Sequence, residues 1–227
     1  MQIKAIKTRV FSEGEDLIDF ILRYIVVKEN SILVVTSKIV SLSEGRVFNR
    51  RDKEKLVRKE SDVYLNPKTW FTIKDDIIMP KAGIDESNAA GKLILLPKDS
   101  FKSAKILRKK LMQKFRLKNL GVLITDSGFL PFRVGAVGLA LGYAGFKGVR
   151  NYIGKKDIFG RVLKFTKTNV SDSLATVAVL CMGEGSERQP LALITDPPVE
   201  FINKVNRKEM KMSPKKDIYA PFFNKLN

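Results

Sequence analysis

Two short acidic stretches, each at the end of an apolar run, carry the residues best suited to chemistry. Residues 83–88 read GIDESN and residues 124–127 read ITDS. Oxygen atoms of carboxylate, amide and hydroxyl groups that gather where a chain leaves a buried segment are ligands for a hard cation holding a phosphate. The rest of the chain is basic, with a formal net charge of +18. We therefore interpret the two stretches as a site for a metal-bound, multiply anionic substrate.

The composition excludes several other kinds of chemistry. The chain has 227 residues, no histidine and a single cysteine, Cys181. A zinc site, a disulfide framework, a Ser-His-Asp triad and a Cys-His pair are all excluded together. No apolar run approaches the roughly 20 residues that span a bilayer, and the N-terminus lacks the apolar stretch of a secretory signal. We expect a cytoplasmic protein without a membrane partner.

The positive charge leaves more than one partner open. It could serve nucleic acid, a small anionic substrate, or no specific ligand. The densest cluster alternates with apolar residues at helical spacing, which favours a solvated helix face over a contact with a ligand or RNA. Aromatic residues make up only 9% of the chain, which disfavours nucleic acid as the partner. The cluster comprises Lys102, Lys105, Arg108, Lys109, Lys110, Lys114, Arg116 and Lys118.

Periodicity and turn residues predict helices and strands in a mixed order. Strands are expected at 32–36, 77–79, 93–96, 121–125 and 191–195. Helices are expected at 13–27, 50–62, 100–115 and 171–182, and residues 37–43 are expected to be helical or irregular. Ser171 or Asp172 is the expected N-cap of the last of these helices. Because there is no regular alternation of strand and helix, the pattern favours an α+β fold over a doubly wound one.

Five glycines crowd the segment 135–148. Their spacing matches neither the G-x-G-x-x-G signature of dinucleotide-binding folds nor a P-loop. We interpret the segment as a strand whose glycines let another backbone or a second subunit approach closely.

Six blocks of sequence follow one another as they do in the coenzyme F-420 γ-glutamyl ligase family. The blocks lie at residues 35–46, 83–88, 95–97, 122–127, 157–161 and 180–185. The chain resembles that family over about residues 10–195. We therefore expect residues 1–227 to form a single ligase-like domain, with residues 196–227 as a divergent C-terminal extension.

The resemblance implies a fold, an assembly and an activity. The family has a two-lobed, mixed-sheet α+β fold and forms intertwined homodimers. It uses GTP and a divalent metal to join L-glutamate through an amide bond to a carboxylate of a deazaflavin cofactor. For this chain the resemblance implies a GTP- or ATP-dependent γ-glutamyl ligase that uses Mg²⁺ or Mn²⁺. Its expected acceptor is anionic, either a deazaflavin coenzyme precursor or a folate-like pterin.

The resemblance also assigns roles to residues of this chain. Asp85 and Asp126 match the catalytic metal ligands, and Ser127 matches a ligand of a second metal. Ser37, Lys38 and Asn88 match nucleotide contacts, and residues 8–11 lie where the family also touches nucleotide. Leu42 stands where the family usually has a lysine that contacts GTP.

Chemistry of this kind needs neither thiolate nor imidazole. We expect the nucleotide to phosphorylate the acceptor carboxylate and the amine to displace phosphate from the resulting acyl phosphate. A metal ion between Asp85 and Asp126 would neutralise the charge on the transferred group. The alternative is a basic protein that binds RNA or another polyanion and whose ligase site has decayed.

Overall fold

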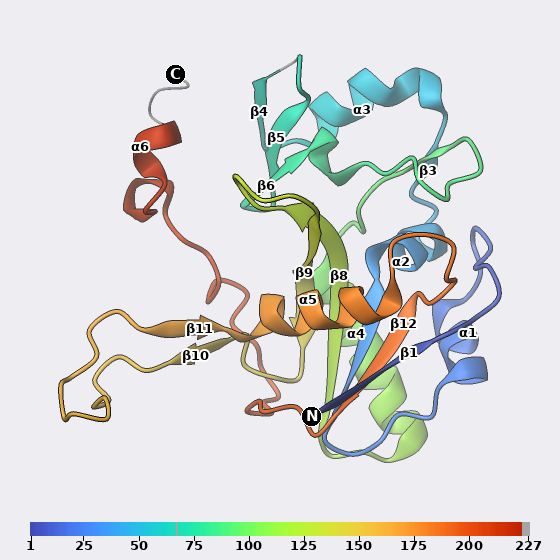
Figure 1. Cartoon of the computed structure of the whole chain (residues 1–227). Helices are drawn as coiled ribbons and strands as arrows, with labels where there is room; N and C mark the ends of the chain where they lie inside the picture. The colour runs from blue at the N-terminus through green and yellow to red at the C-terminus, as the bar shows by residue number, and fades with distance from the viewer. Residues whose placement is uncertain (67, 224–227) are drawn as a thin grey trace. The chain divides into compact units, whose positions relative to one another are not determined.

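The computed structural model describes residues 1–66 and 68–223. The chain packs as two units. Unit 1 comprises residues 1–46 and 97–207, and unit 2 comprises residues 47–96 and 208–227. Helices and strands mix in both the order and the arrangement shown in Figure 1, so the predicted α+β class is confirmed. Within the described ranges, no helix is long and apolar enough to cross a membrane.

Unit 1 is built on a sheet with the strand order β1-β12-β2-β8-β9. The strands are β1 (Gln2–Ile6), β2 (Ser31–Thr36), β8 (Leu120–Phe129), β9 (Ala136–Ala144) and β12 (Leu191–Thr195). β2 and β8 pair in parallel, whereas the other neighbours are antiparallel. β2 and the first half of β8 are nearly continuous apolar runs because these segments are buried on both faces. That pattern is what made these two strands predictable.

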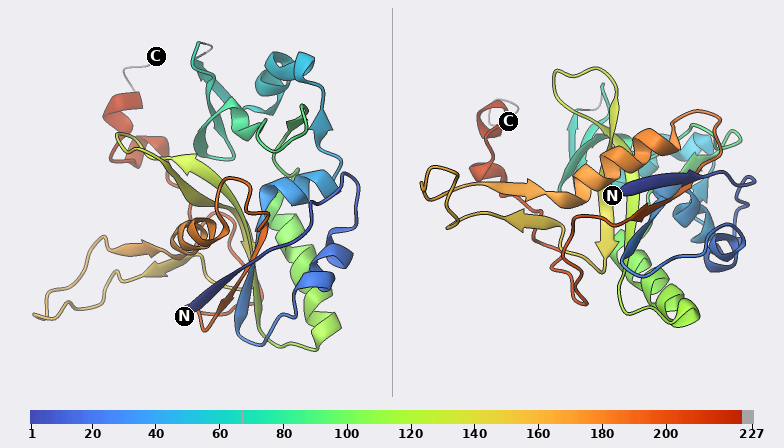
Figure 2. Two further views of the ribbon diagram at one scale, coloured as in Figure 1. Left: turned by 45° about the vertical axis from the view of Figure 1, so that its right-hand side comes forward. Right: turned by 60° about the horizontal axis from the view of Figure 1, so that its bottom comes forward.

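Helices cover both faces of this sheet (Figures 1 and 2). α1 (Leu17–Tyr24) and α4 (Ser100–Phe115) share a core with side chains from one face of β2 and β8. α5 (Val170–Met182) packs against the opposite face of β9, and α2 (Ser37–Ser43) follows β2 directly. The predicted bounds of α4 are confirmed, and residues 37–43, expected to be helical or irregular, form a helix. α1 is shorter than the predicted 13–27.

The helix caps explain where two helices begin. Asp16 caps α1 by accepting a hydrogen bond from the backbone N–H of Asp19. The predicted start at residue 13 was too early, because residues 13–16 precede the first turn of the helix. Asn169 caps α5 by accepting from the Asp172 N–H, so the prediction of Ser171 or Asp172 as the N-cap was wrong.

The glycines of β9 allow both helices to approach the sheet closely. A Cβ on Gly138 would lie 2.3 Å from the carbonyl oxygen of Ala175 in α5, and one on Gly142 would lie 2.5 Å from the backbone nitrogen of Phe101 in α4. The two glycines face opposite sides because a β-bulge at Leu141 lies between them. The close backbone that the sequence predicted therefore comes from helices of the same chain.

A hairpin extends from unit 1 away from the main sheet (Figures 1 and 2). Its strands are β10 (Val149–Asn151) and β11 (Lys167–Asn169), which pair antiparallel. Three large apolar side chains between them are almost fully exposed: Ile158 at 92%, Phe159 at 89% and Phe165 at 89%. The hairpin thus carries apolar surface that no described residue covers.

Unit 1 is interrupted between residues 46 and 97, and Glu44 joins the two sides of the interruption. Its carboxylate accepts hydrogen bonds from the backbone N–H of Lys98 at 2.8 Å and from the hydroxyl of Ser103 at 2.7 Å. The chain therefore leaves unit 1 and returns to it at neighbouring positions.

Unit 2 has a small core of its own, formed by Leu56, Val57, Ile84, Leu93 and Leu95. Around it lie a three-stranded sheet in the order β4-β5-β6 and a short β3–β7 ladder. The strands are β3 (Val47–Phe48), β4 (Val63–Asn66), β5 (Phe71–Lys74), β6 (Ile77–Pro80) and β7 (Leu93–Ile94). The helices are α3 (Lys53–Glu60), α6 (Ala220–Phe223) and the 3-10 turns at Arg50–Asp52, Lys81–Gly83 and Pro214–Lys216.

Candidate functional site

In unit 1 the predicted site residues gather at one edge of the sheet. β2 and β8 run in parallel, and Thr36 lies opposite Thr125. The residues that follow Thr36 and Thr125 therefore lie at the same edge of the sheet. Ser37 and Lys38 follow Thr36, and Asp126 and Ser127 follow Thr125. The carboxyl ends of parallel strands are where open sheets bind ligands. The structure thus brings together two predicted sequence blocks that are almost 90 residues apart in the chain.

A second carboxylate lies beside Ser127. The Ser127 hydroxyl donates a hydrogen bond of 3.4 Å to Glu184 Oε2, in the loop that follows α5. Both side chains are exposed, so the oxygen atoms are open to a ligand. Sequence reasoning assigned no role to Glu184, although it lies in the block at residues 180–185. The sequence signal that could have identified Glu184 was its position between two glycines directly after a helix.

The N-terminal segment reaches the same edge of the sheet. The backbone N–H of Thr8 donates to the Arg188 carbonyl at 2.9 Å, and the N–H of Thr36 donates to the Pro190 carbonyl at 3.0 Å. β1 ends and β12 begins at this edge, because both are antiparallel to their neighbours. The loop at residues 183–190 therefore connects the segment 8–11 with the end of β2.

Two buried hydroxyl groups lie just behind this edge. Ser41 is in α2 and Thr125 immediately precedes Asp126, and they are 0% and 1% exposed. Within the described part of the chain, neither hydroxyl oxygen has a hydrogen-bond partner. A buried polar atom without a partner costs about 1 to 3 kcal/mol. A water, an ion or a ligand group at such a position can supply the missing hydrogen bond.

In unit 2 the predicted residues Asp85 and Asn88 lie on one tight loop. The Asp85 backbone pairs with Ile94 through two hydrogen bonds of 2.9 Å, and its carboxylate accepts from the Ser87 N–H at 2.7 Å. One carboxylate oxygen is thus used to shape the turn. Asp85 is partly buried and Asn88 is exposed. The structure places Asp85 in unit 2 and Asp126 in unit 1.

The loop around Asp85 contains unusual backbone conformations. Lys81, Ala82, Asn88 and Ala90 all have positive φ angles, between 48° and 55°. A non-glycine residue in this left-handed region is uncommon, and each costs free energy that the surrounding structure must offset. Backbone strain of this kind clusters at ligand-binding segments. It was not visible in the sequence, where only glycine and asparagine signal the left-handed region.

Three cations surround the carboxylate next to Asp85. Glu86 contacts Lys53 Nζ at 2.6 Å, Arg50 Nη2 at 3.0 Å and Lys81 Nζ at 3.2 Å. Hydrogen bonds from Lys53 and then Arg50 lower the pKa of Glu86 to about 2. The cluster keeps a surplus of positive charge beside Asp85, which suits the binding of phosphate or carboxylate groups. Sequence reasoning missed all three cations, because they lie up to 36 residues from Glu86.

The side chains at these positions suit a hard cation. Asp85, Asp126, Ser127 and Glu184 offer only oxygen, the ligand that Mg²⁺ and Mn²⁺ prefer. Within the described ranges, no three His, Cys, Asp or Glu side chains come together as a closed metal cage. Mg²⁺ usually binds through one or two carboxylates together with water and substrate phosphates, so an open set of ligands fits it.

Comparison with known proteins gives a consistent result. The family model described as "F420-0:Gamma-glutamyl ligase" matches residues 51–196. The protein named "Coenzyme F420:L-glutamate ligase" from Methanococcus maripaludis strain C7 is 32% identical, with 96% of this chain and 97% of the relative covered. Proteins of that name from Archaeoglobus fulgidus and Methanocaldococcus jannaschii are 33% and 30% identical, covering 82% and 91% of this chain and 83% and 92% of the relatives. The chain therefore belongs to the F420-0:gamma-glutamyl ligase family.

Proposed function

We propose that this protein is a ligase that adds L-glutamate to the deazaflavin coenzyme through a γ-glutamyl linkage, using a nucleoside triphosphate and a divalent metal. The family and the printed names of the relatives support the ligase activity and the coenzyme. The observation that carries the site is the register that places residues 37–38 and 126–127 at the same edge, where the parallel pairing of β2 with β8 ends. This arrangement favours an enzyme over a polyanion-binding protein with a decayed site.

The proposed reaction has two steps. A carboxylate oxygen of the acceptor attacks the γ-phosphorus of GTP or ATP, and the nucleoside diphosphate leaves. The amine of L-glutamate then attacks the acyl carbon, phosphate leaves and the nitrogen loses a proton. Both steps bring negative groups together, so the barrier depends on positive charge and orientation. No histidine or thiolate is needed, in agreement with the composition.

Each predicted residue has a place in this scheme. Lys38 and Ser37 bind phosphate oxygens at the end of β2, and Asn88 is assigned a nucleotide contact. Asp126 and Ser127 in unit 1, with Glu184 as an addition, would offer ligands to Mg²⁺ or Mn²⁺, and Asp85 would offer one in unit 2. When bound, such an ion neutralises phosphate charge. The three cations around Glu86 bind a carboxylate or phosphate group of a substrate.

A homodimer is part of the proposal. Its support here is the exposed apolar surface of the β10–β11 hairpin, with Ile158, Phe159 and Phe165. Exposed apolar groups at such density mark interaction surfaces. The glycines of β9 no longer support it, since α4 and α5 of the same chain fill the space beside them.

The experiment measures metal-dependent nucleotide binding by calorimetry and glutamate addition by mass spectrometry. We expect Asp85→Asn and Asp126→Asn each to abolish both while the protein stays folded. The matched control is Asp196→Asn, an exposed residue that follows β12 at the opposite edge of the sheet. Unchanged metal affinity in either aspartate variant would remove that residue from the site. Comparing GTP with ATP, and a deazaflavin with a pterin acceptor, assigns the substrates.

A further inference from the structure

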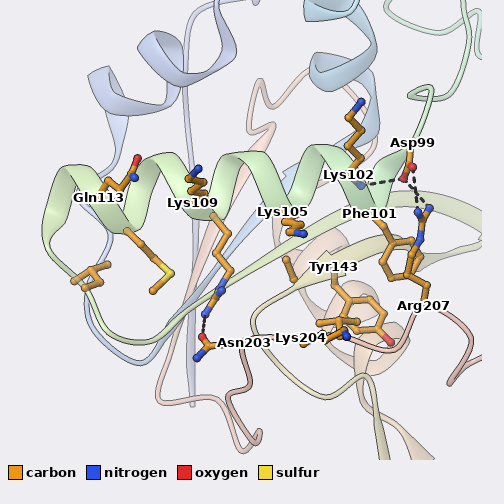
Figure 3. Close-up of a pocket in the computed structure, with 15 residues that line it drawn as sticks. Asp99, Phe101, Lys102, Lys105, Lys109, Gln113, Tyr143, Asn203, Lys204 and Arg207 are labelled. Carbon is orange, nitrogen blue, oxygen red and sulfur yellow. Dashed lines mark hydrogen bonds and ion pairs between the residues drawn. The ribbon is translucent and has the colours of Figure 1, made fainter.

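A basic pocket lies on unit 1 between α4 and the segment 203–207 (Figure 3). Its volume is about 790 Å³, within the range of pockets that bind small molecules. Six cationic side chains line it, against the single carboxylate of Asp99. None of the residues assigned above to the nucleotide or the metal lines this pocket. The cations are Lys102, Lys105, Arg108, Lys109, Lys204 and Arg207.

Both arginines are held in place by the protein. Arg207 makes two hydrogen bonds to Asp99, at 2.7 and 3.1 Å, and its guanidinium lies 4.9 Å from the centre of the Phe101 ring. Arg108 donates to the Leu120 carbonyl at 2.7 Å and to the Asn203 side chain at 3.0 Å. Neither partner of Arg108 is charged, and burial lowers its pKa. Its charge is therefore fixed in the pocket wall without a neutralising carboxylate.

The four lysines have no acidic partner among the described residues. Lys102, Lys105 and Lys109 stand three and four residues apart on α4, where like charges repel one another and destabilise the helix. Lys204 adds a further charge from the facing segment. An anion in the pocket would relieve this repulsion, so its binding should stabilise the fold.

From this arrangement we propose that the pocket binds a compact anion carrying three or more negative charges, supplied by phosphate or carboxylate groups. Lys105 and Lys204 contact it from the two walls, and Arg108 contributes a fixed charge. This binding needs neither the metal nor the nucleotide of the proposed ligase reaction. It is therefore separate from that function.

The pocket fits a small anion better than RNA. Single-stranded RNA is bound by stacking its bases on exposed aromatic rings. Of the two rings in the lining, Tyr143 is only 1% exposed and Phe101 is covered by the Arg207 guanidinium. The pocket thus offers charge without a free stacking surface.

The test uses inorganic tripolyphosphate and citrate as probes, with the whole chain in EDTA. A background substitution, Lys38→Ala, removes the phosphate contact assigned at the end of β2. We expect both probes to raise the melting temperature, and calorimetry to show about a hundredfold weaker binding in Lys105→Gln/Lys204→Gln, the size of two lost charge-assisted contacts. The better probe identifies phosphate or carboxylate as the preferred group.

The matched control is Lys110→Gln/Lys114→Gln, which removes the same charge from α4 at positions outside the pocket lining. We expect it to change the affinity less than about twofold, as distant exposed charges are screened. Equal weakening in both variants, or no binding by the Lys38→Ala protein, would overturn the proposal. So would tighter binding of a short RNA than of tripolyphosphate with the same dependence on Lys105 and Lys204, which would assign the surface to nucleic acid.

Discussion

Lys53 Nζ lies 2.6 Å from Glu86 Oε1, beside the predicted metal ligand Asp85. With Arg50 and Lys81 it lowers the pKa of Glu86 from 4.5 to about 2. A carboxylate with a lowered pKa stabilises the fold at pH values above its ordinary pKa. That contribution is lost as the pH falls from about 5 towards 2.

We therefore expect Glu86→Gln to lower the free energy of unfolding by about 1 to 2 kcal/mol at pH 7, after allowing for solvent screening of a partly exposed group. The difference from wild type should shrink as the pH falls to about 2. Urea unfolding at several pH values measures it. Glu54→Gln, in an exposed pair with Arg58, should change stability by less than about 0.5 kcal/mol. A difference that stays constant with pH would contradict the role of Glu86.

Leu42 stands where the family usually has a lysine. Its side chain is partly buried and packs against the core shared by α1, α4, β2 and β8. We expect Leu42→Lys to strengthen GTP or ATP binding by about 1 to 2 kcal/mol, the range of one charge-assisted contact. The same change should cost about 1 kcal/mol of stability because apolar contacts are lost. Calorimetry and thermal unfolding separate the two effects, and an unchanged affinity would show that the phosphate contact lies elsewhere.

Gly138 has no room for a side chain. A Cβ there would lie 2.3 Å from the Ala175 carbonyl oxygen, and backbone cannot move aside easily. We expect Gly138→Ala to cost at least about 1 to 3 kcal/mol of stability through overpacking against α5. Gly185→Ala is the control, since its Cβ would meet its nearest neighbour at 3.4 Å. Because the contact lies within one chain, the loss should not depend on protein concentration in denaturant unfolding.

The hairpin between β10 and β11 should hold two copies of the chain together. We expect wild-type protein to sediment as a dimer and Phe159→Ser to shift it towards monomer upon hundredfold dilution. Ile106→Ser replaces an exposed apolar residue on α4 and should leave the dimer intact. Wild-type protein that is monomeric at every concentration would refute the homodimer.

The parts of the fold that sequence predicted well have strong local signals. α4 has helical periodicity over 16 residues, and β2 and β12 are short runs rich in β-branched and apolar residues. β1, β4, β5 and the β10–β11 pair were missed because their side chains are mostly exposed or only partly buried, which weakens any alternation. Such strands form because a partner strand supplies hydrogen bonds, and periodicity does not reveal that partner.

In the candidate site too, some residues could be predicted from local sequence and others only from the fold. The types of residue at Asp85 and Asp126 indicated metal and phosphate chemistry, and the resemblance to a family supplied Ser37, Lys38 and Asn88. The register of β2 against β8 was needed to place residues 37–38 beside residues 126–127. Glu184 and the cations around Glu86 depend on contacts across long stretches of chain, so only the folded structure reveals them.

The hydrogen bonds of Glu44 hold together the two points at which residues 47–96 are inserted into unit 1. During synthesis, β2 emerges well before its parallel partner β8, and the loop entropy of about 50 inserted residues opposes their pairing. Glu44 binds Lys98 and Ser103 beside the point where the chain leaves unit 1. These hydrogen bonds shorten the effective loop that must be closed before β8 can pair with β2. Because the chain leaves and re-enters unit 1 at neighbouring positions, a short linker could replace residues 47–96. Unit 1 could then be studied as a smaller protein that ends at Arg207.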